Sequence, residues 1–534
     1  MTDGTQGRQD AARAALRLRG GKDALARLLQ VPPLTVLAAG ATVSEIETIG
    51  FDTPRSHLRK AGLQLRVERR GARCVQVLSS LQAGWSDPIR VLREHAVTAM
   101  KPRTARLAGL AEYPAKATDE ALEPQFRHVV EQRVMALPGT DGGEVAVALE
   151  SGVLEAGGCQ SPCDEVVLSP GPRAAEADSW RVALALHRLE PLVFEPLDPA
   201  ERARIVASDR PPGWHKAGAV ALDEGTSLDD GIGAILRQCF TQWLDNHAAA
   251  RVGRDIEGVH QMRVALRRMR AALGFLAPWL PPVEARAFDK ELKWMARRLG
   301  AVRDLDVLLA ETLAPVRRAR GKDGALRTLE RAVGDARAGA HAALVGAMES
   351  PRYTAMVLEM GGWIAGHGWR GTQEGAWTAP IGREARARIE AAYRQALDAG
   401  GDFTGLDAEA RHNLRLDIKR LRYVLQFVGG AFGERAQPWL RLLALLQDGL
   451  GAANDAALAE AQLERVVSEG ERPAKQQRKL ARASGLVVGW WLARAGGRED
   501  ELRGLWAQFV ALQPFWRGDR PQFQALDGGG NKAT

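Results

Sequence analysis

The chain of 534 residues is 46% hydrophobic and 26% charged, a composition typical of a folded protein that is too long for one ordinary domain. Its net charge of +8 favours an anionic partner, and its four scattered cysteines exclude a disulfide framework. The polar start lacks the apolar core of a signal peptide, and the most apolar late stretch, residues 485–493, is far shorter than the ~20 residues that span a bilayer. We therefore expect a cytoplasmic protein without a membrane partner.

Residues 1–207 are predicted to form a first domain of the α+β class, built on an antiparallel sheet. Runs that alternate apolar and polar residues, as half-buried strands do, lie at 63–70, 73–80, 144–152 and 164–171, and a helical stretch lies at 179–189. Cys159 and Cys163 fall in this domain, but no histidine lies near them in the sequence to complete four zinc ligands. We therefore predict no metal at these cysteines.

Paired prolines and glycines in SDRPPGWHKAG mark a linker over residues 208–223. Beyond it, residues 224–515 are predicted to be all-α, because apolar residues recur at spacings of three and four, as in helices that pack into bundles. The predicted helices lie within 229–251, 256–277, 284–313, 323–349, 383–399, 407–428, 435–468 and 474–511. Residues 516–534 form a predicted C-terminal tail.

The helical part contains an internal repeat. HQMRVALRRMR at 260–270 and HNLRLDIKRLR at 412–422 share the order His, two residues, Arg, three residues, a basic pair, one residue, Arg. Further along, LGAVRDLD at 299–306 is echoed by LGAANDAA at 450–457, at nearly the same distance from the first motif. We infer a duplication that produced two related halves, about 224–370 and 380–515.

Each repeat places a file of cations on one face of its helix. At about 100° per residue, positions 260, 263, 267 and 270 share roughly one quadrant, and so do positions 412, 415, 419 and 422. Solvated faces usually mix signs, and stacked like charges destabilise a helix unless an anion neutralises them. The first file contains no acid and the second only Asp417. The repetition therefore favours anion binding over a solvated helix face.

A second basic row precedes two carboxylates in the first half. Lys293 and Arg297 lie one turn apart, Arg298 and Arg303 follow, and Asp304 and Asp306 come next. We expect the two aspartates to form ion pairs and caps that hold arginines in place, because an all-carboxylate metal site is disfavoured among so many cations.

The helical part resembles the CHAD domain, the conserved histidine α-helical domain. The resemblance covers residues 224–515 and rests on VHQMRVALRRMRAAL, LKWMARRLGAVRDLDVL, HNLRLDIKRLRYVL and LQDGLGAANDAALA. It implies two pseudo-symmetric four-helix bundles with a basic groove that binds inorganic polyphosphate. The implied groove residues are His260, Arg263, Arg267, Arg268, Arg270, Lys293, Arg297, Arg303, His412, Arg415, Lys419, Arg420 and Arg422. Ala444 stands where the first repeat has Lys293, which predicts less charge on that side of the groove.

The first domain resembles the CYTH domain, the triphosphate tunnel fold, through IGFDTPRSHLRKAGLQLRVERRGARCVQVL at 49–78 and EVAVALESG at 144–152. That resemblance implies an antiparallel β-barrel that binds triphosphate with basic side chains and divalent metal with glutamates. The family's E-x-E-x-K positions fall on Arg13, Ala15 and Arg17, without a carboxylate. Arg66 and Arg133 match the family, either as residual anion ligands or as partners of carboxylates inside the barrel.

Three functions are compatible with the sequence. The favoured one is a polyphosphate-binding protein without a cofactor, recruited to polyphosphate granules, whose first domain is a pseudoenzyme. The second is an inorganic triphosphatase that uses Mg²⁺ or Mn²⁺, against which the missing E-x-E-x-K strand argues. The third is non-specific nucleic-acid binding, against which the lack of aromatic residues between the cations argues. GKDG at 321–324 lacks the Ser or Thr and the preceding glycine of a P-loop.

Overall fold

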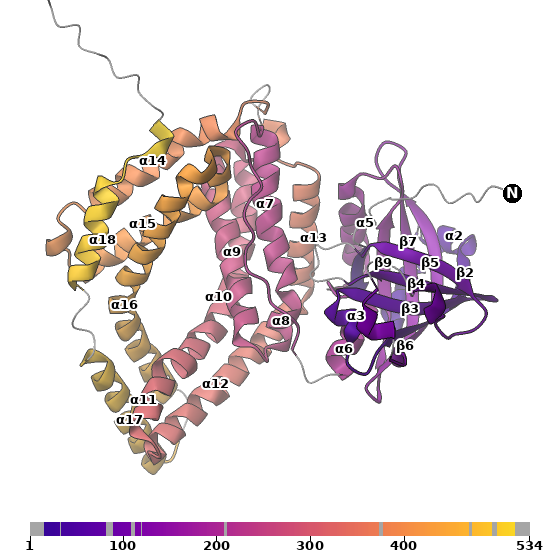
Figure 1. Ribbon diagram of the computed structural model, residues 1–534, viewed down its shortest axis with the longest axis horizontal. Helices are drawn as coiled ribbons and strands as arrows, with labels where there is room; N and C mark the ends of the chain where they lie inside the picture. Colours follow the sequence, from indigo (N-terminus) through magenta and orange to yellow (C-terminus); the bar gives the residue numbers. More distant parts are fainter. Residues whose placement is uncertain are drawn as a thin grey trace, which may run out of the picture. The chain divides into compact units, whose positions relative to one another are not determined.

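The structure is a computed structural model (Figure 1). It describes residues 15–517 except 33, 82–88, 108–112, 119, 208–210, 373–376, 469–471 and 494–498, and only the backbone at 106, 118, 372 and 452–459. Arg13, a predicted signature position of the first domain, lies outside the described residues. No helix in the described ranges is long and apolar enough to cross a membrane.

The N-terminal domain is a ten-stranded antiparallel sheet in the order β10-β1-β9-β7-β6-β2-β3-β4-β5, with β8 paired to β7. Its strands are β1 (Leu16–Arg19), β2 (Thr42–Asp52), β3 (Leu63–Arg70), β4 (Arg73–Ser80), β5 (Val91–Val97), β6 (Glu123–Pro138), β7 (Glu144–Ala156), β8 (Cys159–Pro162), β9 (Glu165–Pro170) and β10 (Val193–Phe194). The predicted strands at 63–70 and 73–80 coincide with β3 and β4, and the other two predicted strands overlap β7 and β9.

The sheet is open, whereas a closed barrel was predicted. Among the described residues the strand order ends at β10 on one side and at β5 on the other, and the two are not paired with each other. A barrel needs a continuous ladder around its circumference, and β10 contributes only two residues. The predicted class, an antiparallel β domain followed by helices, is confirmed.

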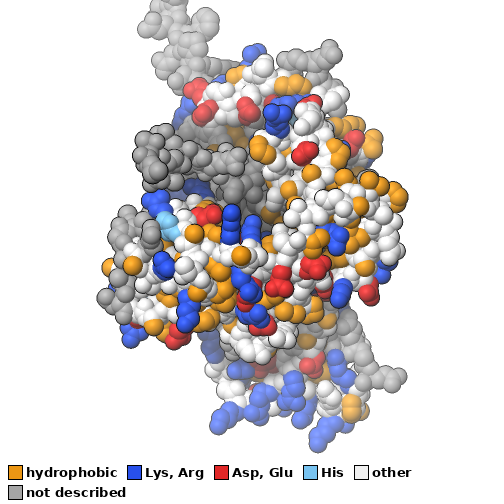
Figure 2. Space-filling model, turned by 90° about the vertical axis from the view of Figure 1, so that its right-hand side faces the viewer, with side chains coloured by type: hydrophobic (Ala, Val, Ile, Leu, Met, Phe, Trp, Pro, Cys, Tyr) orange, Lys and Arg blue, Asp and Glu red, His pale blue; other side chains and the backbone are white. Residues whose placement is uncertain are grey.

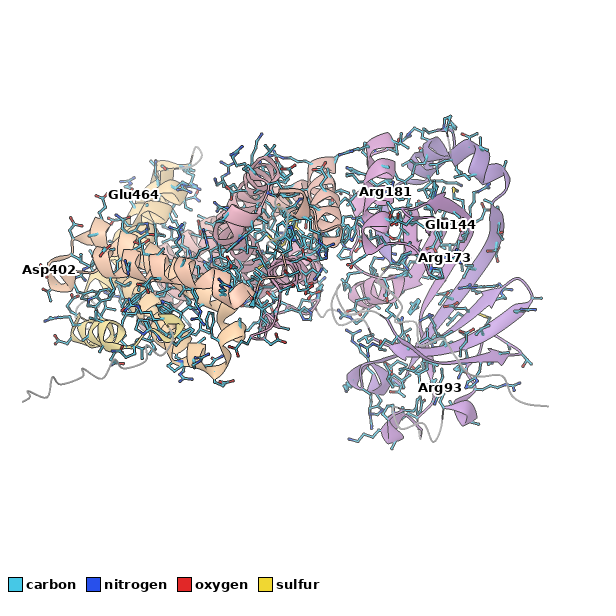
Figure 3. The ribbon with its side chains drawn as sticks, turned by 90° about the horizontal axis from the view of Figure 1, so that it is seen from above. Arg93, Glu144, Arg173, Arg181, Asp402 and Glu464 are labelled. Atoms are coloured by element: carbon cyan, nitrogen blue, oxygen red, sulfur yellow. The ribbon has the colours of Figure 1, made fainter. Side chains whose placement is uncertain are left out.

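Helix α5 (Glu176–Leu189) contains the predicted helical stretch 179–189 and packs on the sheet. Asp178 fixes its start, because the carboxylate accepts hydrogen bonds from the backbone N–H of Ala175 and of Thr140, in the turn after β6. Arg181, which is labelled in Figure 3, donates to the same carboxylate and to the carbonyl of Pro138. These bonds hold α5 against the end of the β6–β7 hairpin.

The two faces of the sheet differ in chemistry. On one face, Leu65 and Val67 of β3 pack in a core with Leu58 of α3 (His57–Lys60). The strand register places a different set on the other face, here called the polar face: Arg17, Arg66, Glu68, His128, Gln132, Glu150 and Glu165. Helix α6 (Pro199–Ala207) contacts β6 and β7, and its Ala203 packs with Ile46 and Val130 of that face.

The chain divides into two compact units. The first unit comprises Met1–Gly218, Ile235–Gln373 and Gln462–Val487; the second comprises Ala219–Ala234, Glu374–Ala461 and Val488–Thr534. Each unit therefore combines segments that are separated in the sequence. The helices of the helical part are α7 (Leu228–Asp245), α8 (His247–Val252), α9 (Ile256–Leu276), α10 (Pro282–Val307), α11 (Ala314–Arg320), α12 (Gly324–Met348), α13 (Pro351–Ala365), α14 (Ile381–Ala399), α15 (Ala408–Val428), α16 (Gln437–Ser468), α17 (Ala474–Leu492) and α18 (Glu499–Ala511).

The two helices that carry the repeated motif begin in the same way. Asp255 caps α9 by accepting from the N–H of Glu257, and Asp407 caps α15 by accepting from the N–H of Ala410. The apolar stripes predicted for them are buried: Met262, Leu266, Met269 and Leu273 on α9, and Leu414, Ile418, Leu421 and Leu425 on α15. Burial of these stripes fixes which face of each helix is left for the cations.

Candidate anion-binding site

Two sets of cations are defined by the repeated motif. The first cation file is His260, Arg263, Arg267 and Arg270 on α9, within the first unit. The second cation file is His412, Arg415, Lys419 and Arg422 on α15, within the second unit. The other predicted site cations of the helical part are Arg268 on α9, Lys293, Arg297 and Arg303 on α10, and Arg420 on α15.

Arg263 of the first file lies over a glycine of α10. A Cβ atom added to Gly300 would stand 3.2 Å from Nη1 of Arg263. Gly300 belongs to the LGAVRDLD motif, so the structure brings the two repeated motifs of the first half into contact. The glycine leaves room for the guanidinium to lie close to the backbone of α10.

The second unit repeats this arrangement with its own residues. A Cβ atom added to Gly451 of α16 would stand 3.0 Å from Nη2 of Arg415 and 3.3 Å from its Cζ. Gly451 is the glycine of LGAANDAA, the counterpart of Gly300. The duplication inferred from two pairs of motifs is therefore also a duplication of one contact, an arginine seated over a glycine.

His260 of the first file lies in cationic surroundings. The ring is half-buried, and this burial, together with the charges of Arg303 and Arg267, lowers its pKa below the ordinary value of a histidine. Glu257 and Glu311 act in the opposite direction but do not reverse the shift. At neutral pH the imidazole is therefore mostly uncharged, and an anion bound nearby would favour its protonation.

The two aspartates that follow the basic row of α10 have different surroundings. Asp306 is buried and accepts a hydrogen bond of 2.8 Å from Nε of Arg337 on α12, which is the expected ion-pair role. Burial raises the pKa of Asp304, although Arg263 and Arg465 lie near enough to oppose that rise. Arg465 lies outside both repeated motifs and was not among the predicted site residues.

Acidic partners contact several of the predicted cations, among them Arg270, Lys293 and Arg303. Arg270 and Lys293 share Asp289, with N–O distances of 2.8 Å and 2.7 Å. Burial of the Asp289 carboxyl opposes ionisation, but the hydrogen bonds from Lys293 and Arg270 keep its pKa below the ordinary value. Arg303 pairs with Glu311 at 2.9 Å. These cations are therefore partly neutralised within the protein.

Arg268 differs from its neighbours on α9. Its side chain is only 3% exposed, and Nη1 donates a hydrogen bond of 3.0 Å to Oε1 of Gln242 on α7. The arginine thus lies inside the bundle, whereas Arg267 beside it is half-buried and Arg297 on α10 is exposed.

The cations of α15 are more exposed. His412 and Arg420 are exposed, whereas Arg415, Lys419 and Arg422 are half-buried. Arg420 donates to Gln395 at 3.1 Å and Arg422 donates to Gln447 at 3.3 Å, and both of these acceptors are neutral amides. These contacts position the guanidinium groups without cancelling their charge.

The two arginines predicted as residual anion ligands of the first domain lie far apart. Arg66 stands opposite Gly50 of β2, and Arg133 stands opposite Val43 of the same strand. Because these β2 positions are seven residues apart, the arginines lie on opposite faces of the sheet, roughly 23 Å apart along the strand. Arg66 also donates to Glu68 at 2.6 Å and to Ser79 at 3.3 Å.

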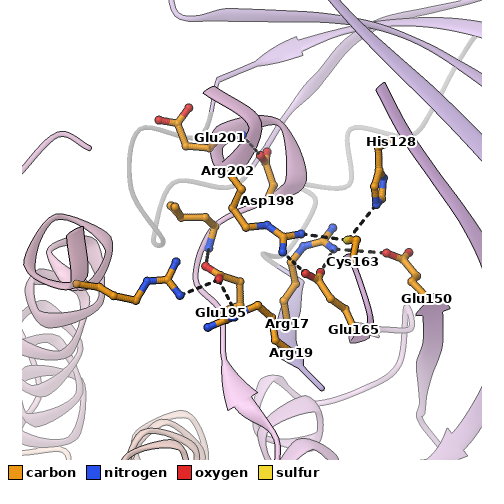
Figure 4. A network of polar contacts seen from close by, with 12 residues as sticks. Arg17, Arg19, His128, Glu150, Cys163, Glu165, Glu195, Asp198, Glu201 and Arg202 are labelled. Atoms are coloured by element: carbon orange, nitrogen blue, oxygen red, sulfur yellow. Dashed lines mark hydrogen bonds and ion pairs between the residues drawn. The ribbon is translucent and has the colours of Figure 1, made fainter. Parts of the chain in front are cut away.

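The polar face of the sheet holds a network of ion pairs (Figure 4). Arg17 of β1 donates to Glu165 at 3.3 Å and lies 3.8 Å from Glu150. Glu165, which is fully buried, also pairs with Arg202 of α6. The position that aligns with the family's E-x-E-x-K strand therefore carries an arginine that is bonded to the glutamates of the same face.

Burial suppresses the reactivity of the thiol and imidazole in this network. His128 Nε2 lies 3.1 Å from Cys163 Sγ, a contact between residues far apart in the sequence. Burial and the neighbouring Arg17 and Arg202 lower the pKa of His128 to about 4, and burial next to Glu165 raises the pKa of Cys163 to about 12. In the described ranges, no group of three or more His, Cys, Asp or Glu side chains is arranged to hold a metal ion.

Comparisons with known proteins identify relatives of the helical part. A family model described as the CHAD domain matches residues 234–464. The crystal structure of the CHAD domain from the plant Ricinus communis is 30% identical, covers 56% of this chain and 98% of its own, and has a TM-score of 0.48. PptA from Streptomyces chartreusis is 19% identical, covers 54% of this chain and 100% of its own, and has a TM-score of 0.39.

A further match is a proposed adenylyl cyclase from Hippeastrum, described as having a dominant triphosphatase activity. It is 15% identical, covers 36% of this chain and 94% of its own, and has a TM-score of 0.26. No curated protein sequence matches the chain significantly.

Proposed function

Because this chain belongs to the CHAD domain family, we propose that it binds inorganic polyphosphate through its two cation files and is thereby recruited to polyphosphate granules. The observation that carries the proposal is a contact that occurs once in each unit: Arg263 lies over Gly300, and Arg415 lies over Gly451. Each unit thus presents the same guanidinium in the same setting. A ligand with a repeating anionic group is matched by a protein with a repeating cationic one.

The chemistry of the files suits phosphate oxygens. A guanidinium is planar, stays charged at all physiological pH values and donates paired hydrogen bonds to two oxygens of one phosphate group. The second file adds Lys419, whose ammonium acts as a compact point charge. His260 is predominantly neutral in the free protein and can take up a proton when phosphate approaches. Binding in this form requires neither a nucleophile nor a cofactor.

The polar face of the sheet supports a role for the first domain other than cutting phosphate chains. A triphosphatase of the tunnel type needs free carboxylates to hold Mg²⁺ or Mn²⁺. Here Glu165 is bonded to Arg17 and Arg202, and Glu150 lies near Arg17, so these side chains do not fit a metal. We therefore propose that the sheet domain is a pseudoenzyme. Release of phosphate from tripolyphosphate by the intact chain with Mg²⁺ or Mn²⁺ would contradict this.

Competition binding tests the main proposal. Long-chain polyphosphate, duplex DNA and RNA of equal charge should be titrated against the full chain over a series of salt concentrations. We expect polyphosphate to bind most tightly, with an affinity that falls steeply with salt because the contacts are ionic. Equal affinity for DNA would instead support non-specific nucleic-acid binding.

The matched variant reverses four charges of the files. R263E/R267E/R415E/R422E should abolish polyphosphate binding while the helical content measured by circular dichroism is unchanged. The control variant R286E/K290E/R331E/K60E reverses four exposed cations outside the files and should bind like the native chain. Loss of binding in the control, or its retention in the file variant, would assign the affinity to net charge rather than to the files.

A further inference from the structure

A pocket of about 490 Å³ lies in the first unit between the start of α12 and helix α17. It is lined by Asp323, Gly324, Ala325, Lys475, Arg478, Lys479 and Arg482. None of these residues belongs to the cation files or to α10. Figure 2 shows Lys and Arg side chains gathered at the lower end of the molecule, where α11, α12 and α17 lie in Figure 1.

The four cations of the pocket share one face of α17. The spacings between consecutive cations are three, one and three residues, for Lys475, Arg478, Lys479 and Arg482. Residues three or four apart are neighbours on a helix surface, so these side chains lie together over two turns. All four are exposed, and α17 contains no Asp or Glu along its length. Like charges at these spacings repel one another, so this face is destabilised unless a counter-charge comes from elsewhere.

Among the described lining residues, the one carboxylate, Asp323, supplies little of that counter-charge. Asp323 caps α12, and its Oδ1 accepts hydrogen bonds from the N–H groups of Ala325 and Leu326, which lower its pKa. Arg482 approaches it at 3.7 Å, and the part of the lining that the structure describes holds no further acid for Lys475, Arg478 and Lys479. Arg320, at the end of α11, adds a further positive charge near Asp323.

We propose that this pocket is a second anion-binding site that takes a short run of consecutive phosphate groups. Four cations over two turns of α17 extend over roughly 10 Å, more than a single phosphate group would occupy. The described lining residues include no aromatic side chain on which a base could stack, which favours a bare phosphate chain over nucleic acid. The existence of the site rests on the pocket itself, whereas polyphosphate as its occupant rests on the function proposed above.

Because Asp323 already occupies the first N–H groups of α12, the ligand is held by side chains rather than by the helix terminus. Side-chain ammonium and guanidinium groups that are exposed gain less from each contact than buried ones and are screened by salt. The pocket should therefore release its ligand at lower salt than the half-buried arginines of the cation files.

Titration calorimetry of the full chain with tripolyphosphate tests the site, because this probe is short enough to occupy the pocket alone. At low salt the native chain should show binding to more than one class of site. The pocket variant K475Q/R478Q/K479Q/R482Q should lose one class, with the affinity of that class reduced about tenfold or more, because all four charges that contact the ligand are removed. The control K60Q/R286Q/R331Q/K290Q removes the same charge elsewhere and should retain both classes.

The file variant R263Q/R267Q/R415Q/R422Q separates this proposal from the previous one. If it loses only the other class of sites, both proposals stand. If it binds like the native chain while the pocket variant does not, the proposed role of the files fails and the pocket remains. Binding by the pocket variant that equals that of the control overturns the pocket, as does a native chain that binds no tripolyphosphate. Displacement by DNA of equal charge at equal concentration would overturn its preference for phosphate chains.

Discussion

The polar face of the sheet and the first cation file are both rich in arginine, but the arginines of the two surfaces contact different groups. On the sheet, Arg17 and Arg202 converge on the buried carboxylate of Glu165. On α9, Arg263 lies over a glycine and Arg267 faces a half-buried histidine whose pKa it helps to lower. The number of arginines is thus a poor guide to anion binding. What matters is which groups each arginine contacts: the buried carboxylate of Glu165 holds both Arg17 and Arg202, whereas Arg270 of the file shares the partly exposed carboxylate of Asp289 with Lys293.

The strongest test of this comparison removes the carboxylate of Glu165 from the sheet. In Glu165→Gln, Arg17 and Arg202 lose their buried ionic partner, and breaking such a pair typically costs about 3 kcal/mol. We expect the free energy of unfolding, measured by urea denaturation followed by circular dichroism, to fall by about that amount. The exposed Glu144→Gln on β7 is the matched control and should leave stability nearly unchanged.

The same variant also tests the principle behind the contrast. If free cations create an anion site, tripolyphosphate should raise the melting temperature of Glu165→Gln more than that of the native chain, because the ligand replaces the missing charge. An equal shift for both proteins would show that unpaired arginines alone do not make this face bind anions.

Substitution of the glycines under the arginines should have a smaller effect, and one that acts mainly on polyphosphate binding. Gly300→Ala and Gly451→Ala place a methyl group 3.2 Å and 3.0 Å from a guanidinium nitrogen, so the arginine must move. We expect polyphosphate affinity to fall several-fold. Helix stability should hold or rise by up to about 1 kcal/mol, because alanine is the better helix former.

The control for this pair is Gly334→Ala on α12, where an added Cβ meets nothing within 4 Å. It should gain similar helix stability and keep full affinity. If all three variants bind polyphosphate like the native chain, the contact between arginine and glycine does not shape the binding site.

Much of the fold was predictable where one face of an element is buried. The sequence alternates apolar and polar residues at 63–70 and 73–80 because one face of these strands, with Leu65 and Val67, packs in a core. Strands β2 and β6 were not predicted: ionic partners such as Glu47 and Arg127 lie on one of their faces and the polar network on the other, which obscures the alternation. The two-residue β10 is too short for any periodicity.

The site was predictable as a set of helix positions but not as a set of contacts. Helical spacing identifies the files, but the same wheel places Arg267 and Arg268 equally far, about 130°, from the apolar stripe, so it does not predict the interior position of Arg268. The seat of Arg263 over Gly300 depends on how α9 packs against α10, which no local pattern contains. The cations of α17 could also have been predicted from the sequence, because they lie on a helix face without acidic residues, but they fall outside the repeated motif.

The smallest expected effect is a pH dependence of binding that belongs to His260. In the free protein, burial and Arg303 lower its pKa, so the ring is mostly neutral at pH 7. Bound phosphate favours the charged ring and raises that pKa, so binding takes up a proton at pH values between the free and bound pKa. Polyphosphate affinity should therefore increase, by a few-fold at most, as pH falls through this interval.

Calorimetry in two buffers of different ionisation enthalpy measures the proton uptake directly. The native chain should show a fractional uptake on binding that His260→Gln reduces, with most of the affinity retained because the arginines of the file remain. The sheet supplies the contrasting case, since His128 is buried beside Cys163 and its pKa of about 4 keeps it neutral throughout the range. His128→Gln should consequently leave the proton uptake unchanged. An uptake that persists in His260→Gln would assign the proton to another group and remove the histidine from the binding step.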